Sequence, residues 1–267
     1  MKRQLPFEFI YQVAALVSAM IIVHLVHITL IRPNAEAIIE RQVAAAAEGG
    51  DYIQDSSIYV VLKDIEQESC FILMFWAIAI MGYKGRNALR EGALLQYEIV
   101  SVNDGMSILP EDTREYTRPI QALDKSVQNF LLPRALTAAL QRFASTRNVQ
   151  NVSEAVKAVC DSEQDRLDSE LSMVRYIAWA IPSIGFIGTV RGISAALGQA
   201  YQAVEGNIIG VTTSLGVAFN STFVALVISI VIMFLMHQLQ LIQERLVLDI
   251  HTYCDERLIR HMQVRGR

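Results

Sequence analysis

The sequence lacks the charge pattern of a nucleic-acid-binding protein. Lysine and arginine number 23 against 27 aspartates and glutamates, giving a formal charge of -4. No Lys/Arg-rich stripe interleaved with aromatic residues occurs anywhere in the 267 residues. A nucleic-acid interface requires such a basic footprint. Nucleic acid is therefore not expected as a partner.

Cysteines are few, and motifs of catalytic sites are missing. Cys70, Cys160 and Cys254 are odd in number, widely spaced and free of CxxC or Cys/His clustering. Such spacing predicts reduced structural thiols and no metal site. The sequence also lacks a glycine-rich phosphate loop and a Ser/His/Asp set. We therefore expect neither an enzyme nor a bound cofactor.

Long apolar runs are abundant, since 52% of the residues are hydrophobic while 19% are charged. A bilayer about 30 Å thick needs roughly 20 apolar residues in a crossing helix. Three runs reach that length: Phe9–Ile31, about Ile177–Leu197 and about Ile209–Met236. The first is too long for the apolar region of a signal peptide. All three are predicted to be retained transmembrane helices.

A fourth run, Cys70–Tyr83, has only 14 residues, which is short for a span. Ile58–Leu62 could extend it at its N-terminal end. That extension requires the intervening charged residues to lie at the interface or to face other protein; they are Lys63, Asp64, Glu66 and Glu68.

The basic residues indicate the orientation, because cytoplasmic flanks of spans carry an excess of lysine and arginine. Segment 32–68 holds three basic residues against eight acidic ones. The other span flanks are basic, through Lys2, Arg3, Lys84, Arg86, Arg90, Arg245, Arg257, Arg260, Arg265 and Arg267. This pattern predicts four spans, with both termini cytoplasmic and segment 32–68 on the opposite side of the membrane, which is the periplasmic side if the membrane is a bacterial inner membrane.

The expected fold is an all-α integral membrane protein with about four transmembrane helices and long cytoplasmic helical extensions. Neither glycine nor proline occurs in 135–180 or 217–265, so helices should run on beyond the spans. Spacing such as Leu136/Leu140/Phe143 predicts an amphipathic cytoplasmic helix. The predicted regions are an N-terminal transmembrane hairpin over 1–83, a cytoplasmic helical region over 84–173, a second transmembrane hairpin over 174–237 and a cytoplasmic helical tail over 238–267.

Small residues recur at helical spacing in the third span. Gly185, Gly188, Gly192 and Ala195 form a groove that a neighbouring backbone could approach closely. Pro182, one turn earlier, can kink the helix and free a carbonyl.

The last span carries a matching stripe of small and hydroxylic residues, formed by Leu215, Ala218, Thr222, Ala225 and Ser229. Such a stripe either packs tightly or lines a polar path. By spacing alone, plain helix packing is the more common explanation, because small-residue faces occur in many membrane bundles and hydroxyls often bond to their own helix.

Residues 185–193, GFIGTVRGI, resemble the GLFGTVWGI motif of the TolQ/ExbB subunits in the MotA/TolQ/ExbB proton channel family of ion-driven motors. Residues 220–223, NSTF, are similar to that family's threonine segment in the next helix. The resemblance covers about 168–245 and implies that Thr189 and Thr222 are pore threonines. It also places near the ion pathway Ala218, Asn220, Ser221, Ala225 and Ser229.

What the resemblance implies is a homopentamer around two copies of a single-span MotB/TolR/ExbD-like partner that carries an essential aspartate. Neither pore span contains Asp or Glu, so the titrating carboxylate is expected from another chain. Thr189 and Thr222 would hydrogen-bond that carboxylate or a water chain. Protons or sodium ions are the transported species. Membrane lipids are the other expected neighbours.

Two residues depart from the family pattern: Val217 stands where ExbB-type subunits often carry a glutamate, and Arg191 replaces the motif's tryptophan. An arginine within a span needs compensation. Snorkelling toward headgroups or Glu205 is one possibility, and a structural hydrogen bond to carbonyls or His24 is the other. His24 and His27 lie on one side of the first span, where a neutral bridging histidine is the more common case.

The functional hypothesis is a channel-forming subunit of a proton- or sodium-driven inner-membrane motor that couples ion flow to motion of its partner. A non-conducting scaffold or assembly factor with the same fold is the alternative. A solute transporter is disfavoured, because the sequence shows no internal repeat.

Overall fold

The structure is a computed structural model of the chain, and it describes residues 7–47, 57–97, 99–100 and 106–264. Of the predicted periplasmic segment 32–68, residues 48–56 lie outside this range. So do four of the basic residues that support the orientation: Lys2, Arg3, Arg265 and Arg267.

The described residues are almost entirely helical, and they contain no β-strand apart from an isolated bridge between Ile108 and Met262. Four helices are long and apolar enough to cross a membrane: Phe7–Gln42, Ile65–Gln96, Val149–Gly198 and Ile209–His261. The protein is an all-α membrane protein with four candidate spans, as predicted.

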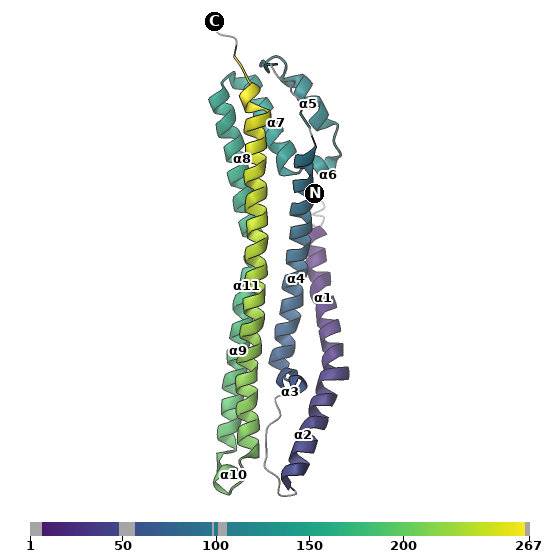
Figure 1. The fold of residues 1–267 in the computed structure, drawn as a ribbon, viewed down its shortest axis with the longest axis vertical. Coiled ribbons are helices and arrows are strands. Elements are labelled where there is room, and N and C mark those ends of the chain that lie inside the picture. The colour runs from purple at the N-terminus through teal and green to yellow at the C-terminus, as the bar shows by residue number, and fades with distance from the viewer. Residues whose placement is uncertain (1–6, 48–56, 98, 101–105, 265–267) are drawn as a thin grey trace, which may run out of the picture. The chain divides into compact units, whose positions relative to one another are not determined.

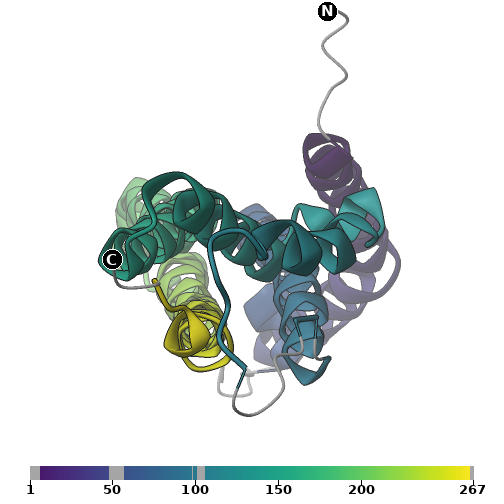
Figure 2. The same ribbon diagram turned by 90° about the horizontal axis from the view of Figure 1, so that it is seen from above.

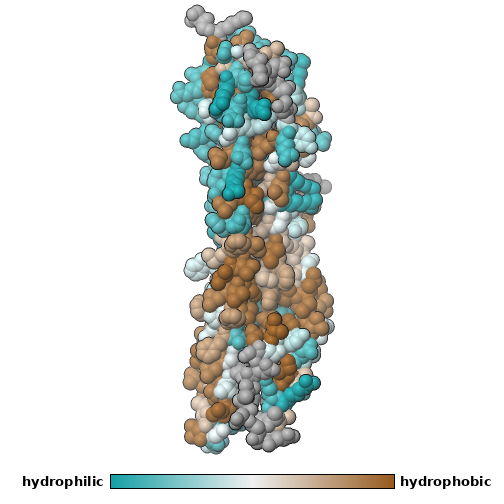
Figure 3. Space-filling model, viewed as in Figure 1, coloured by the Kyte–Doolittle hydropathy of each residue, from teal (hydrophilic) through white to brown (hydrophobic). Residues whose placement is uncertain are grey.

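The chain divides into two compact units. The first comprises Met1–Gly82 and Met173–Met236, and the second comprises Tyr83–Ser172 and His237–Arg267. Apolar side chains gather on the helices of the first unit, whereas hydrophilic ones predominate on the second (Figure 3). The exposed apolar side chains of the first unit suit a lipid environment.

The first unit begins with α1 (Phe7–Val26), which continues through a π-helical turn (His27–Ile31) into α2 (Arg32–Ala47). A short helix, α3 (Ile58–Leu62), precedes α4 (Ile65–Gly92) (Figure 1). Residues 58–62, which the sequence left open as an extension of the second span, form a separate helix, because the chain is not helical at 63–64. The span gains its length instead by starting at residue 65.

Two contacts fasten α1 to α4 within this unit. The indole Nε1 of Trp76 donates to the carbonyl of Gln12 at 2.9 Å, and the hydroxyl of Tyr11 donates to the carbonyl of Ala79 at 3.2 Å. Such contacts satisfy polar groups that lipid would leave without partners.

The second transmembrane hairpin, which carries the expected pore threonines and is called the pore hairpin below, consists of α9 (Ser172–Gly198), the short α10 (Ala200–Val204) and α11 (Ile209–Arg257), with α9 and α11 side by side in Figure 1. α11 runs for 49 residues without a break. The prediction of a long helical continuation after the last span is confirmed, since its sequence offers no proline or glycine to end it.

The second unit packs around a hairpin of α7 (Leu131–Thr146) and α8 (Val149–Glu170), which lie side by side in Figure 2. Arg147 adopts a left-handed conformation (φ 50°) between them, and the side chain of Asn148 caps α8 by accepting from Gln150 N at 2.8 Å. The predicted apolar stripe is buried, together with its counterparts on α8 and α11: Leu136, Leu140, Phe143, Val152, Val156 and Ile250. The unit's remaining helices are α5 (Thr113–Gln121), α6 (Lys125–Gln128) and 3-10 turns at Ala93–Gln96 and Ile259–His261.

Candidate functional site

The seam between α9 and α11 is built on three glycines of α9. An added β-carbon at Gly185 would lie 2.6 Å from Cβ of Ala225, and one at Gly192 would lie 2.7 Å from Cβ of Ala218. Real β-carbons do not approach so closely. Glycine is thus required for the two backbones to come together.

Gly188 lies where three helices meet. A β-carbon there would lie 2.5 Å from Cβ of Ser221 on α11 and 3.1 Å from Cγ of Glu66 on α4. The small side of α9 therefore admits a carboxylate side chain as well as the neighbouring pore helix.

Thr189 and Thr222 face each other across this seam, and their hydroxyl oxygens are in hydrogen-bond contact. Thr189 also bonds to the carbonyl of Ala218 at 3.1 Å, and each hydroxyl bonds to that of Gly185 at 3.2 Å. A hydroxyl has one hydrogen to donate and two lone pairs. One hydrogen of the pair joins the two hydroxyls, and the other can go to a carbonyl. Lone pairs then remain on both oxygens for an arriving donor.

Both threonines are half-buried, whereas the small residues Ala218, Ser221 and Ala225 are buried. Ala218 and Ala225 have no exposed surface, and Ser221 is 1% exposed. The hydroxyl of Ser221 donates to the carbonyl of Val217 in its own helix at 2.8 Å. These three residues pack the seam, and the two threonines lie at its accessible edge.

Ser229 donates a hydrogen bond to the carbonyl that Pro182 leaves without its usual backbone partner. Proline has no N–H, so residue 182 cannot bond to the carbonyl of Ala178, four positions earlier in α9. The Ser229 hydroxyl donates to that carbonyl at 3.1 Å, and Ser229 is buried. This contact supports a packing role for Ser229.

Asn220 lies apart from the threonine pair. Two positions from Thr222, it points roughly 200° away around α11. It lines a small pocket together with Val60 and Lys63 of the α3 region and Gln42 of α2. The structure does not bring Asn220 to the hydroxyls with which the sequence grouped it.

Comparison with family models matches residues 127–252 to the MotA/TolQ/ExbB proton channel family, a range that includes the seam. That region belongs to this family. Comparisons with curated proteins and with solved structures found no significant match. The MotA/TolQ/ExbB family is one of channels, so the matched region is of the proton-channel type.

Arg191, where this chain departs from the MotA/TolQ/ExbB motif, pairs with acids that precede or begin the second span. Its Nη2 lies 2.7 Å from a carboxylate oxygen of Glu66 and 3.7 Å from one of Asp64. The Glu66 side chain is 6% exposed and that of Arg191 is 50% exposed. These ion-pair partners are neither Glu205 nor His24, the two side chains considered from the sequence.

Glu68 forms a second charged cluster with the N-terminal helices. Its two carboxylate oxygens lie 2.6 Å from Nδ1 of His24 and 2.7 Å from Nη2 of Arg32. His27, 1% exposed, lies with Nε2 3.1 Å from the carbonyl of Leu62 and Nδ1 3.1 Å from that of Val23. His27 thus bridges the π-helical turn to α3.

Sequence reasoning missed Glu66 and Glu68 as functional candidates. Their signal was present: three acids sit within five residues at the edge of a span too short to cross alone. The direction in which each acid points depends on the residue at which α4 begins, and the periodicity of the sequence does not determine that residue.

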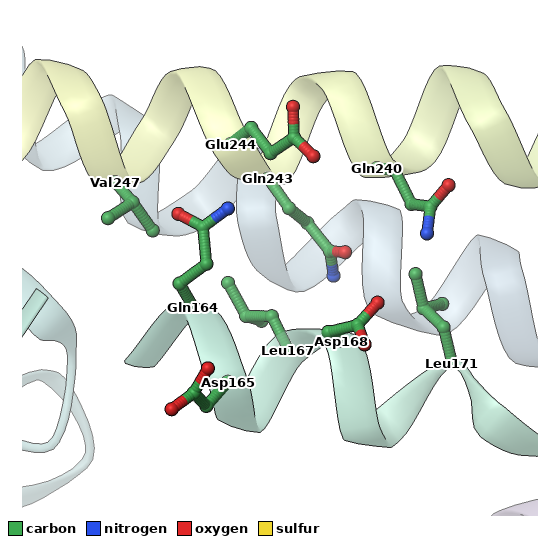
Figure 4. Close-up of a pocket in the computed structure, with 9 residues that line it drawn as sticks. All are labelled: Gln164, Asp165, Leu167, Asp168, Leu171, Gln240, Gln243, Glu244 and Val247. Atoms are coloured by element: carbon green, nitrogen blue, oxygen red, sulfur yellow. The ribbon is translucent and has the colours of Figure 1, made fainter. Parts of the chain in front are cut away.

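The second unit has a separate polar cavity of about 310 Å³ between α8 and α11. Side chains from both helices point toward each other there, among them Asp168 and Gln243 (Figure 4). Its lining combines amides, carboxylates and aliphatic groups without a nucleophile–base pair. In the part of the chain that the structure describes, no cluster of ligands could hold a metal ion.

Proposed function

We propose that this protein is the channel-forming subunit of a proton- or sodium-driven inner-membrane motor, in which ion flow moves a single-span partner. The observation that carries the proposal is the contact between the Thr189 and Thr222 hydroxyls at the accessible edge of the α9–α11 seam. Family membership of the same region supports it.

The partner would supply the titrating group. The apolar parts of α9 and α11, 177–197 and 209–236, contain neither Asp nor Glu. A carboxylate that carries a proton across must then come to the hydroxyl pair from elsewhere. A MotB/TolR/ExbD-like single span with a membrane aspartate fits this need. Its protonated carboxyl would donate to the threonine lone pairs, and its ionised form would accept from the hydroxyls.

The proposed assembly is a homopentamer around two partner copies, in the inner membrane with both termini cytoplasmic. The orientation follows from the basic flanks of the spans. The neutral and ionised states of the partner's aspartate would bind the ring differently, which is the condition for ion transfer to bias motion. No catalytic step is assigned to the chain.

The test is partner-dependent ion flux in membrane vesicles. We expect collapse of an imposed pH or sodium gradient only when the chain and a single-span partner are present together, and no collapse when the partner's aspartate is changed to asparagine. A chain that assembles with its partner and conducts neither ion would be a scaffold, and the proposal would fail.

A further inference from the structure

The start of α4 holds acids that face two different helices. Glu66 and Glu68 are two positions apart, which on a helix separates their directions by roughly 200°. Glu66 reaches Arg191 on α9 at 2.7 Å, and Glu68 reaches His24 on α1 and Arg32 on α2. Both carboxylates are buried. One turn of α4 thus contacts the pore hairpin with one face and the N-terminal helices with the other.

Glu66 also touches the seam itself. At the β-carbon position of Gly188, Cγ of Glu66 would lie 3.1 Å away and Oγ of Ser221 2.6 Å away. Thr189 is the next residue of α9, and Arg191 points roughly 200° away from it. The ion pair therefore acts on the side of α9 opposite the hydroxyl pair.

We propose that Glu66 is a positioning residue of the ion path, because its ion pair with Arg191 fixes the rotation of α9 and thereby keeps Thr189 against Thr222. Glu68 anchors the same turn to α1 and α2, so the pore hairpin is oriented by the rest of the unit. That the positioned groups form an ion path rests on the proposed function, whereas the ion pair and the threonine contact do not.

Only one member of this pair is buried, because the Glu66 side chain is 6% exposed and that of Arg191 is 50% exposed. Loss of Arg191 would leave the buried Glu66 charge without this partner, which is costly, and loss of the Glu66 charge would remove the nearest acid from Arg191. Asp64, 3.7 Å from the same Arg191 nitrogen, gives the guanidinium a second acid. Its Oδ2 is buried and has no hydrogen-bond partner. Removing the charge of Glu66 should therefore make the rotation of α9 less restricted. Removing the charges of both Asp64 and Glu66 should make it less restricted still.

The experiment measures the threonine contact directly, through oxidative cross-linking of a Thr189→Cys, Thr222→Cys chain whose three native cysteines are changed to alanine. We expect Glu66→Gln to slow cross-linking about tenfold, the factor for losing one charge-assisted contact. Adding Asp64→Asn should slow it further. The matched control is Glu205→Gln, which removes an exposed acid of the hairpin loop and should leave the rate unchanged.

Two further variants keep the test decisive if a charge deletion prevents folding. Arg191→Lys should retain most of the cross-linking rate, because both contacts are made by a single guanidinium nitrogen. The exchange Glu66→Arg with Arg191→Glu should restore much of the rate lost in Glu66→Gln. Cross-linking that is unchanged in Glu66→Gln, as slow in Arg191→Lys as in Arg191→Leu, or not restored by the exchange would overturn the proposal.

Ion flux of the same charge variants, measured in chains that retain Thr189 and Thr222, separates this inference from the proposed function. If the wild-type chain with its partner conducts no ion, the proposed function fails, while the cross-linking result still decides the role of Glu66. If ion flux is present but the cross-linking rate is the same in Glu66→Gln as in the parent chain, only the positioning role of Glu66 fails.

Discussion

At the scale of single residues, the hydroxyls of the pore hairpin divide into two kinds. Thr189 and Thr222 contact each other at the edge of the seam, whereas Ser221 and Ser229 give their hydrogens to backbone carbonyls inside it. All lie in small-residue segments of the sequence, so spacing did not distinguish them. The difference depends on which carbonyl each hydroxyl meets, and this requires the position of the second helix.

The contact between Ser229 and the carbonyl freed by Pro182 predicts a non-additive pair of mutations. Ser229→Ala should lower the free energy of unfolding by about 1 kcal/mol, the usual net value of a hydrogen bond. In a Pro182→Ala background, the new N–H of residue 182 bonds to Ala178, so Ser229→Ala should cost much less. Unfolding midpoints of the purified protein would measure this double-mutant cycle. Equal costs in both backgrounds would contradict the assigned contact.

At the scale of elements, the close approach of α9 and α11 predicts a sharp difference between two glycines of α9. Gly188→Ala should destabilise the hairpin by about 1–3 kcal/mol, the usual cost of overpacking, because Ser221 would lie 2.5 Å from the new β-carbon. Gly198 has nothing within 4 Å, so Gly198→Ala is the matched control and should be tolerated. The yield of folded protein in membranes and its unfolding midpoint measure both variants. Equal behaviour would mean that the seam is looser than described.

The sequence predicted which segments form helices, but it did not predict which helices contact one another. Apolar runs of about 20 residues predicted three spans, and the lack of Gly and Pro over 217–265 predicted the length of α11. The second span was harder, because its apolar core of 14 residues is completed by acids that stay buried only through Arg191, Arg32 and His24. Acidic residues lower the hydropathy of a segment and so argue against a span. In the folded chain, basic side chains that are distant in sequence compensate the charges of these acids.

At the scale of the whole molecule, the proposed orientation predicts which side of the membrane each exposed position faces. A thiol reagent that does not cross membranes should label Ser145→Cys only from the cytoplasm and Asn207→Cys only from the periplasm, since both positions are exposed. Labelling of Ser145→Cys from the periplasm alone would reverse the topology.

The unaltered chain provides the background for this measurement. Its three cysteines are buried. Burial raises the pKa of the Cys160 thiol to about 11 and that of Cys254 to about 12, and both lie outside the apolar spans. The thiolate is the reactive form, so both should react slowly at pH 7, and faster only as the pH approaches these values.

The central claim is that the hydroxyl pair forms part of an ion path, and partner-dependent flux in a Thr189→Ala, Thr222→Ala chain tests it most directly. Loss of two hydroxyls leaves a helical hairpin able to assemble, so the double variant should co-purify with its partner. Thr252→Ala, an exposed threonine of α11 that bonds only to its own helix, is the matched control. We expect the double variant to lose the flux and Thr252→Ala to keep it, because only the double variant removes hydroxyls from the proposed path. Full flux through the double variant would show that the hydroxyl pair is not part of an ion path.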